Sequence, residues 1–524
     1  MKKYLLKRIL FSIFSLIVVT GTVMILVYSL MDRSLILMSD DTYQKRTGGD
    51  KIAYAYSRYQ EYGYIYYDQF PNWLNKKIDD PSSPEYVAAI NAIQKTEGGE
   101  FPDNPYCVEF VQEKQKDGYK VEWLKPIYNS KGVLTSSGYL LATRDKNIFV
   151  RLGEYFANFF YVDTIWSVND PNLPASERYV RWEWDPYSNM PALVGSGTKN
   201  RYLIYFDNQF PFIHQNIISI NLGKSRSYRT DTTNVLLART GEPVTEDKVL
   251  PRDLYTNPDL VSPSDLDFHK VTYSEIISPF DENIYGAGNH YVNAVQYKDG
   301  FTRMGNSFVI GIIATVLAYF VGLPIGIWMA RKKDRLPDKI GNAYIIFIIA
   351  VPSLAYIYIF SAIGTNLFQL PLKWQYVEDH SMIWIAFILP IISLALPSIG
   401  GLMRWTRRFM IDQENSDYVK FARSQGLTER EIFSQHIFRN AMIFLVHGIP
   451  IDIMAALTGA IITERVYGVP GVGGLLTDAI NKYDNGVIVA AAVFYTTLSI
   501  VALLLGDLLL AKYDPRVSFT NERG

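Results

Sequence analysis

The feature that most constrains the fold of this chain is a set of six long apolar runs. A helix needs about 20 apolar residues to cross the roughly 30 Å hydrocarbon core of a bilayer. Runs of that length lie at 9–31, 305–330, 342–364, 381–403, 441–463 and 487–511. The pattern predicts a mainly α polytopic membrane protein with six transmembrane helices.

The first apolar run has a basic start, MKKYLLKRIL, which a cleaved secretory signal would also have. However, the run is longer than the about 7–15 apolar residues of a signal core, and no small-x-small cleavage site follows it. We therefore expect a first helix that is retained in the membrane.

The distribution of lysine and arginine predicts which ends of the helices face the cytoplasm. Sixteen basic residues lie in the N-terminal segment, in the link RKKDRLPDK at 331–339 and in residues 404–440. The short links after the third and fifth runs carry only Lys373, Arg465 and Lys482. Because short basic loops stay in the cytoplasm, we expect both termini there and residues 32–300 outside the cell.

These expectations divide the chain into four parts. They are the N-terminus with its first helix (1–31), an extracellular domain (32–300), a five-helix transmembrane core (301–515) and a cytoplasmic tail (516–524). The net charge of −1 gives no argument for a nucleic-acid partner.

The outer segment is predicted to be a folded, mixed α/β domain. Residues 40–300 hold 25 of the 37 tyrosines, with strand-like runs such as RYLIYF (201–206) and helical stretches such as 84–95. We interpret the tyrosines as core and strand packing, with a contact surface for a docked protein or peptide as the alternative. Cys107 is the single cysteine, so it cannot form a disulfide within the chain, and we expect it to be buried.

Signatures of covalent or metal chemistry are weak in this sequence. The segment GKS at 223–225 lacks the earlier glycine of a phosphate-binding loop, because Ile218 occupies that position. The six histidines are scattered without metal-ligand spacing, and VGSGT (194–198) does not match G-x-S-x-G. We therefore assign no catalytic residues and no metal ligands.

A polar stretch at 416–440 interrupts the apolar pattern on the expected cytoplasmic side. Ser416 or Asp417 can cap a first short helix, and Gly426 stands where a left-handed C-terminal residue belongs. Thr428 and Glu431 form a T-x-x-E capping box that starts a second helix. The apolar stripe Ile432, Phe433 and Ile437 is expected to contact a partner groove, although packing on the chain's own bundle is the alternative.

This stretch resembles the EAA loop of ABC-transporter permeases, and most closely that of the oligopeptide/dipeptide family. The pattern Y-x-x-x-A-R-x-x-G-L followed by H-x-x-R-N-A is matched by Tyr418, Ala422, Arg423, Gly426, Leu427, His436, Arg439, Asn440 and Ala441. One departure is Lys420, where the family has an acidic residue.

Other segments resemble the same family in the same order. They are MKKYLLKRIL, NLGKS with GEPVTE (221–246), ERVYGVPGVGGLLTDAI (464–480) and GDLLLAKYDPRV (506–517). The resemblance covers residues 1–30 and 221–517 apart from an insertion near 250–300, and it points to the B-type subunit with the type I ABC importer fold. The enlarged outer segment resembles Ami-type peptide permeases of Gram-positive bacteria, which implies a plasma-membrane location.

The resemblance implies the partners of the chain. They are a homologous C-type permease, two cytoplasmic ATPases that bind ATP and Mg, an extracellular lipid-anchored binding protein, and peptides as substrate; no cofactor is implied for this chain itself. The residues that it implies for coupling to the ATPases are Tyr418, Phe421, Ala422, Arg423, Gly426, Leu427, Glu431, Ile432, Phe433, His436 and Arg439.

Ionisable residues within apolar runs usually face a cavity or a partner, because they are costly in lipid. Asp452 is a candidate for the translocation path, and Asp507 is expected to brace Arg516 or a neighbouring helix; structural pairing is the alternative for both. In the segment GVPGVGG we expect a tight turn at the outer mouth, either a gate or a plain turn. The gate candidates are Glu464, Pro470, Gly471 and Gly473.

Three other functions remain open at this point. The chain could be a permease for another small solute, such as dipeptides or nickel. It could also be a membrane-anchored receptor that senses peptides, or it could carry an outer hydrolase built from residues far apart in the sequence. Peptide preference cannot be read from one chain, because such pockets are assembled from several.

Overall fold

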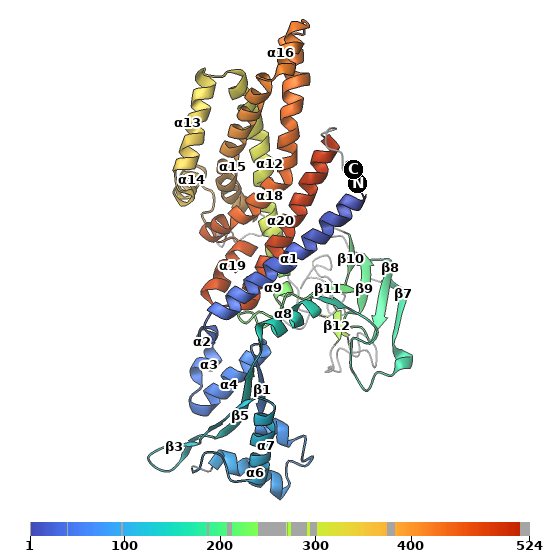
Figure 1. Cartoon of the computed structure of the whole chain (residues 1–524), viewed down its shortest axis with the longest axis vertical. Coiled ribbons are helices and arrows are strands. Elements are labelled where there is room, and N and C mark those ends of the chain that lie inside the picture. Colours follow the sequence, from blue (N-terminus) through green and yellow to red (C-terminus); the bar gives the residue numbers. More distant parts are fainter. Residues whose placement is uncertain are drawn as a thin grey trace, which may run out of the picture.

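The computed structural model describes residues 2–38, 40–95, 98–185, 188–206, 212–238, 269, 271–273, 291–293, 301–374 and 383–513. Figure 1 shows a helical bundle at one end of an elongated molecule and a mixed α/β region at the other. The expected tail 516–524, most of the insertion near 250–300 and Arg516 lie outside the described residues.

Within these ranges, five helices are long and apolar enough to cross a membrane. They are α1 (Lys2–Leu30), α12 (Arg303–Arg331), α15 (Ile383–Glu414), α18 (Arg439–Tyr467) and α20 (Asn485–Tyr513). Each corresponds to one expected apolar run. Helix α12 packs along α15, α18 packs against both, and α20 contacts α18 and α1 (Figure 1).

The expected run at 342–364 forms two helices instead of one. Helices α13 (Leu336–Ala350) and α14 (Ser353–Phe368) meet at an angle of 112°. Between them Val351 is extended, with φ −83° and ψ 128°, which is the conformation that a following proline favours. The sixth expected span is therefore present only as this broken pair, with its bend at Pro352.

Helices α12 and α15 approach closely because glycine lines their contact. A Cβ on Gly326 would lie 2.8 Å from Cβ of Thr406 and 2.9 Å from the carbonyl oxygen of Met403. Small residues at such positions let two helix backbones pack tightly in a bilayer. Prolines, which interrupt the helical hydrogen-bond ladder, lie inside three of the long helices, namely Pro324 in α12, Pro390 and Pro397 in α15, and Pro450 in α18.

The part of the outer domain farthest from the bundle is a three-stranded antiparallel sheet with helices around it (Figure 1). Its strand order is β1 (Ile65–Gln69), β5 (Tyr139–Asp145) and β2 (Lys120–Leu124), and Leu141 of β5 pairs with Gln69 and Glu122. The surrounding helices are α2 (Arg33–Ile36), α3 (Asp41–Lys45), α4 (Gly48–Glu61), α5 (Phe70–Leu74), α6 (Pro84–Lys95) and α7 (Pro105–Lys116).

The core of this lobe is aromatic. Phe70, Trp73 and Phe110 pack on one another, and Cys107 is buried in the same cluster. Burial raises the pKa of the Cys107 thiol to about 12, which keeps it protonated and unreactive at neutral pH. The expectation of a buried, structural cysteine is confirmed.

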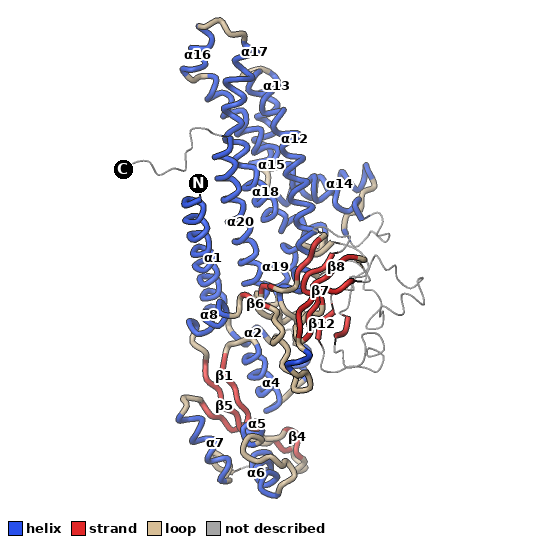
Figure 2. The backbone as a smooth tube through the Cα atoms, turned by 90° about the vertical axis from the view of Figure 1, so that its right-hand side faces the viewer, coloured by secondary structure: helices blue, strands red, loops and turns tan. Residues whose placement is uncertain are grey.

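A second lobe carries a four-stranded antiparallel sheet beside the outer end of the bundle (Figure 2). The strand order is β10 (Ile213–Gln215), β9 (Tyr202–Phe206), β8 (Met190–Ser196) and β7 (Tyr179–Asp185). The shorter elements are β3 (Ile127–Tyr128), β4 (Leu134–Ser136), α8 (Ile148–Ala157), β6 (Phe160–Val162), η1 (Ala175–Glu177), β11 (Ile218–Ile220), α9 (Thr232–Leu237), β12 (Val271–Tyr273) and β13 (Tyr291–Asn293). The mixed α/β prediction for the outer segment is confirmed.

The outer domain is tied to the bundle at the turn between α19 (Val472–Asn481) and α20. There the buried carboxylate of Asp484 accepts hydrogen bonds from the Ser225 hydroxyl at 2.7 Å and from the Ser227 amide at 2.8 Å. An apolar cluster continues this junction, with Met24 of α1, Leu236 of α9 and Val487 of α20 in contact.

Candidate functional site

The polar stretch at 416–440 forms an elbow at the tip of the bundle, where α16 (Asp417–Ser424) and α17 (Glu429–Glu431) lie (Figure 2). Ser416 is the N-cap residue of α16, and Gly426 has φ +83°, in the left-handed region. Thr428 and Glu431 form both hydrogen bonds of a capping box. The left-handed glycine and the capping box read from the sequence are therefore confirmed, and together they fix the angle between the two helices. The Ser416 side chain makes no capping hydrogen bond and donates instead to the Gln413 carbonyl.

The second helix of the elbow is not a separate element. After α17 the chain continues through a π-helix, η5 (Ile432–Phe438), directly into α18. Residues Glu429–Tyr467 form one span of 39 residues. The elbow is thus joined to α18 without an intervening loop.

The apolar stripe of the elbow packs inside the chain. Ile432 is 0% exposed, and Ile437 and Ala422 are buried beside Ala330 of α12 and Met410 of α15. Phe433 is half-buried, with the Arg331 guanidinium 4.5 Å from its ring centroid. Ile432 and Ile437 of this stripe therefore follow the alternative of packing on the chain's own bundle, because their side chains fill the groove between its helices. Ala422, a predicted coupling residue outside the stripe, is buried with them.

Other predicted coupling residues remain accessible on the elbow. Phe421 is 62% exposed, and Arg439 and Glu431 are also exposed. Arg423 is an exposed residue that spans the glycine turn, where its Nε lies 2.9 Å from the Glu429 carboxylate. The remaining members are half-buried, namely Tyr418, Leu427 and His436, and the Tyr418 hydroxyl donates to the His436 carbonyl at 3.3 Å. Among the named coupling residues, Phe421 is the exposed aromatic.

At the opposite end of α18, Glu464 organises the outer turn. Its side chain is 1% exposed, and one carboxylate oxygen accepts hydrogen bonds from the amides of Gly473 at 2.8 Å and Gly474 at 3.1 Å. The other oxygen accepts from the Ser307 hydroxyl of α12 at 2.6 Å. Glu464 therefore caps the start of α19 and joins three helices at one point.

The glycines of GVPGVGG make this arrangement possible. A Cβ on Gly471 would lie 2.3 Å from the Glu464 carboxylate, and one on Gly473 would lie 2.5 Å from Cα of Ile461. Gly468 ends α18 in the left-handed region with φ +66°. The carbonyl of Pro470 accepts a hydrogen bond from Asn306 Nδ2 at 2.9 Å. The predicted tight turn is confirmed, and the gate candidates of the sequence lie together in it.

The two acids predicted within spans have different surroundings. Asp452 is exposed on the surface of the isolated chain and accepts a hydrogen bond from the Tyr319 hydroxyl of α12 at 2.7 Å. Asp507 forms an ion pair of 2.7 Å with Arg8 of α1. The expectation that Asp507 braces a neighbouring helix is thus confirmed, with α1 as that helix.

Comparison with known proteins places this geometry in a family. Residues 322–519 match the family model described as the binding-protein-dependent transport system inner membrane component. The oligopeptide transport system permease protein AmiC of Streptococcus pneumoniae is 33% identical over 100% of both chains. The chain belongs to the oligopeptide-permease family of ABC transporters.

Two further similarities involve shorter proteins. The dipeptide transport system permease protein DppB of Lactococcus lactis is 29% identical over 52% of this chain and 90% of its own length. Among solved structures, a chain of the MetNI methionine ABC transporter covers 40% of this permease and 93% of its own length, with 12% identity and a TM-score of 0.33. The match to AmiC spans the whole chain, including the enlarged outer domain.

Several residues that hold this permease together were not predicted from the sequence. Ser307 and Asn306 contact the outer turn, and their signal is a pair of polar residues at the start of an apolar run. Asp338 of α13 is buried and accepts two hydrogen bonds from Arg407 of α15, at 2.5 and 2.8 Å. In the described residues, no group of three or more potential metal ligands occurs.

Proposed function

We propose that this permease is the B-type translocating subunit of an ATP-driven oligopeptide importer. In this proposal a homologous C-type permease completes the pathway, and two cytoplasmic ATPases supply the energy by binding ATP and Mg. A lipid-anchored binding protein delivers peptides from outside, and this chain carries out no covalent chemistry itself. In the same proposal, both termini lie in the cytoplasm of a Gram-positive cell.

The observation that carries the proposal is the continuity of α17, η5 and α18. One helix, Glu429–Tyr467, has the elbow at its cytoplasmic end and Glu464 near its outer end. Since Ile432 and Ile437 anchor the elbow to α12 and α15, force on the exposed face of α16 is expected to move the bundle as well as the loop. An alternating-access mechanism needs such a connection between the motor side and the outer turn.

Asp452 fits a translocation path in this scheme. A carboxylate near mid-span on an exposed face of one subunit is costly against lipid, so it is expected to face the partner permease or the substrate. The Tyr319 hydroxyl holds it in place. Glu464, Pro470, Gly471 and Gly473 then act at the outer gate. The family names leave dipeptides or another small solute as the alternative cargo, which competition of peptide uptake by such solutes would reveal.

The test concerns Phe421, the exposed aromatic side chain of α16. Burying a phenylalanine in a partner contributes about 1.5–3 kcal/mol, so Phe421→Asp is expected to lower uptake of a radiolabelled oligopeptide about tenfold or more. Less ATPase is also expected to co-purify with the variant. The matched control is Leu336→Asp, because Leu336 is 69% exposed at the start of α13 on the same side of the bundle. Normal uptake and normal ATPase recovery for Phe421→Asp would overturn the coupling role.

A further inference from the structure

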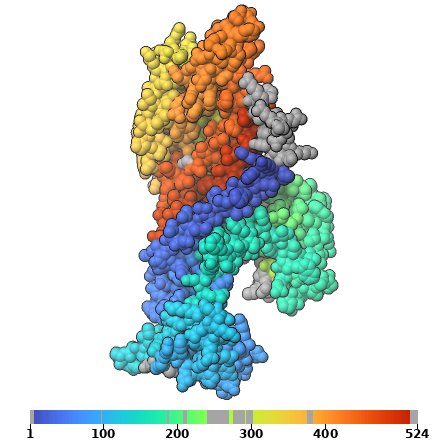
Figure 3. All heavy atoms as spheres, viewed as in Figure 1, coloured from blue at the N-terminus to red at the C-terminus, as the bar shows by residue number. Residues whose placement is uncertain are grey.

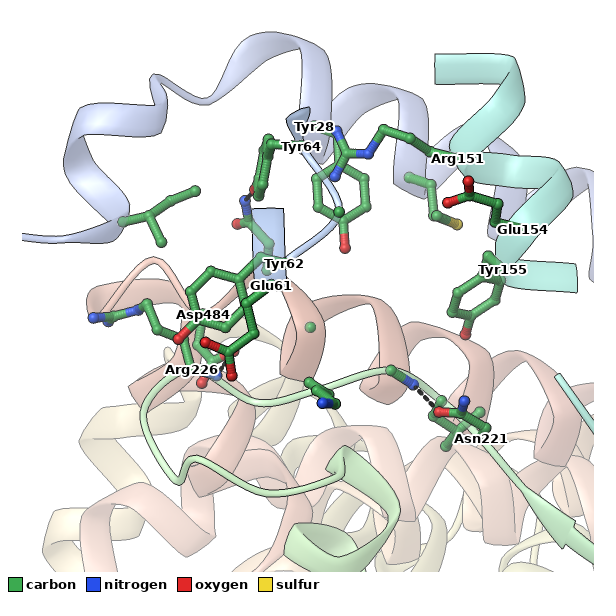
Figure 4. A pocket seen from close by; sticks show the side chains of 18 of the residues that line it. Tyr28, Glu61, Tyr62, Tyr64, Arg151, Glu154, Tyr155, Asn221, Arg226 and Asp484 are labelled. Carbon is green, nitrogen blue, oxygen red and sulfur yellow. Dashed lines mark hydrogen bonds between the residues drawn. The ribbon is translucent and has the colours of Figure 1, made fainter. Parts of the chain in front are cut away.

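A cavity of about 290 Å³ lies where the outer end of α1 meets the outer domain. Figure 4 shows its walls, which come from α1, α8, the segment around Asn221 and the turn that carries Asp484. Figure 3 shows α1 in dark blue crossing this face of the molecule, with the teal helix α8 against its lower end. None of the proposed transport steps uses this cavity.

Arg151 places a buried positive charge in the cavity wall. Its side chain is 8% exposed, and the guanidinium lies 3.9 Å from the ring centroid of Tyr28 and 4.1 Å from that of Tyr64 (Figure 4). No carboxylate of the described residues forms an ion pair with Arg151. Because a buried charge is costly without a counter-ion, this wall favours an anionic group.

The acidic residues around the cavity are already engaged elsewhere. Glu154 pairs with Lys146 at 2.9 Å, and Glu61 pairs with Arg58 at 2.5 Å. Asp484 accepts from Ser225 and from the amides of residues 226 and 227. Asp231 is the exception, because only a backbone bridge joins it to Lys224, but its carboxylate forms no ion pair with Arg151 among the described residues. Arg226 donates to the Lys482 carbonyl. The cation of Arg151 is therefore left for a ligand.

Two neutral polar atoms of the wall also lack hydrogen-bond partners among the described residues. The Tyr155 hydroxyl is buried, and in Figure 4 it points from α8 toward the segment that carries Asn221. The side-chain carbonyl of Asn485 is buried as well, while its amide nitrogen donates to the Tyr64 hydroxyl. Buried polar groups are normally satisfied, so unpaired ones beside a cavity point to a bound polar molecule.

The position of the cavity indicates which class of ligand it would bind. Met24 and Tyr28 lie near the outer end of the α1 span, and Asn485 begins the α20 span, which puts the cavity at headgroup depth. Large apolar side chains are exposed nearby on α8, β6 and β11, namely Phe149, Val150, Phe160, Val162, Ile218 and Ile220. Such a surface suits acyl chains. We propose that the cavity binds the phosphate of a phospholipid headgroup, to which Arg151 and Tyr155 donate hydrogen bonds.

The test measures lipid binding by the full-length chain. Native mass spectrometry of the delipidated protein, titrated with dioleoyl phosphatidylglycerol, is expected to show one tight lipid. Arg151→Gln is expected to weaken that binding about tenfold, because it removes a charge-assisted hydrogen bond to the phosphate. Tyr155→Phe is expected to weaken it about threefold, and Arg151→Lys, which keeps the charge, to retain most of it.

The matched control is Arg144→Gln. Arg144 also stacks on two tyrosines, with its guanidinium 4.7 Å from the Tyr66 ring and 4.9 Å from the Tyr119 ring, but it lies outside the cavity. Its variant is expected to bind lipid normally. Unchanged lipid affinity in Arg151→Gln and Tyr155→Phe would overturn the proposal. Displacement of the lipid by a tetrapeptide with a free carboxylate, but not by its amide, would also overturn it and assign the cavity to peptide.

Discussion

Glu464 has its position because two facing residues lack side chains. Its carboxylate occupies the space that a Cβ of Gly471 would fill, and the close approach of Gly473 to Ile461 brings the α19 amides within reach. The acid is therefore held by backbone donors and Ser307, without a basic partner among its hydrogen bonds in the described structure. A site of this kind tolerates very little added volume.

Gly473→Ala tests this close packing. The new Cβ would lie 2.5 Å from Cα of Ile461, so the turn must shift, and overpacking of this kind costs about 1–3 kcal/mol. We expect a lower midpoint of thermal unfolding for the purified protein. The control is Gly474→Ala, where the nearest atom, the Val469 carbonyl oxygen, is 3.6 Å away. Equal midpoints for the two variants would show that α19 is not held closely against α18.

At the scale of elements, the elbow depends on one backbone conformation. Gly426 separates α16 from α17 with φ +83°, and nothing lies within 4 Å of the position where its Cβ would be. A glycine is therefore favoured here because of the left-handed backbone conformation, and not because a side chain would clash with a neighbour. The capping box of Thr428 then starts the next helix two residues later.

Gly426→Ala is expected to loosen α16 without any steric clash. The left-handed conformation costs an alanine about 1–2 kcal/mol, so residues 417–424 should exchange amide hydrogens several-fold faster with deuterium. Gly401→Ala is a matched control, because its Cβ also meets nothing within 4 Å but it lies inside α15, where alanine is favoured. Unchanged exchange in α16 would mean that packing, and not the turn, positions this helix.

Local signals made the elbow predictable from the sequence, whereas tertiary contacts decided its buried face. A capping box and a left-handed glycine are each encoded within about four residues, and both appear as expected. Whether Ile432 faces a partner or the chain's own bundle depends on Ala330 and Met410, which are far away in the sequence. The bend at Pro352 could also be predicted locally, because a proline breaks the helical hydrogen-bond ladder.

Polar pairs between distant segments also could not be predicted from the sequence. Ser307 with Glu464, Tyr319 with Asp452 and Arg407 with Asp338 are each separated by more than 60 residues. One sequence shows that such side chains are unusual in apolar runs, but it does not show which two meet. The cavity around Arg151 could not be predicted either, because residues from five separate segments line it.

At the scale of the whole molecule, the outer domain and the bundle meet at Asp484. This residue is buried in the α19–α20 turn, close in sequence to the outer turn that Glu464 caps. Its hydrogen bonds reach residues 225–227, which lead into α9. The outer turn and the outer domain are therefore connected through a carboxylate with several donors.

Asp484→Ala tests this connection between the two regions. Removing the carboxylate leaves the Ser225 hydroxyl and the Ser227 amide without their acceptor, and each buried unsatisfied donor costs about 1–3 kcal/mol. We expect limited proteolysis to cut residues 224–231 several-fold faster while the bundle stays intact. Asp478→Ala is the control, since Asp478 forms a partly exposed ion pair of 2.6 Å with Arg465 on the same side, worth at most about 1 kcal/mol. If both variants resist proteolysis like the parent protein, the outer domain is held by the apolar cluster around Met24 and Leu236, and Asp484 does not hold it to the outer turn.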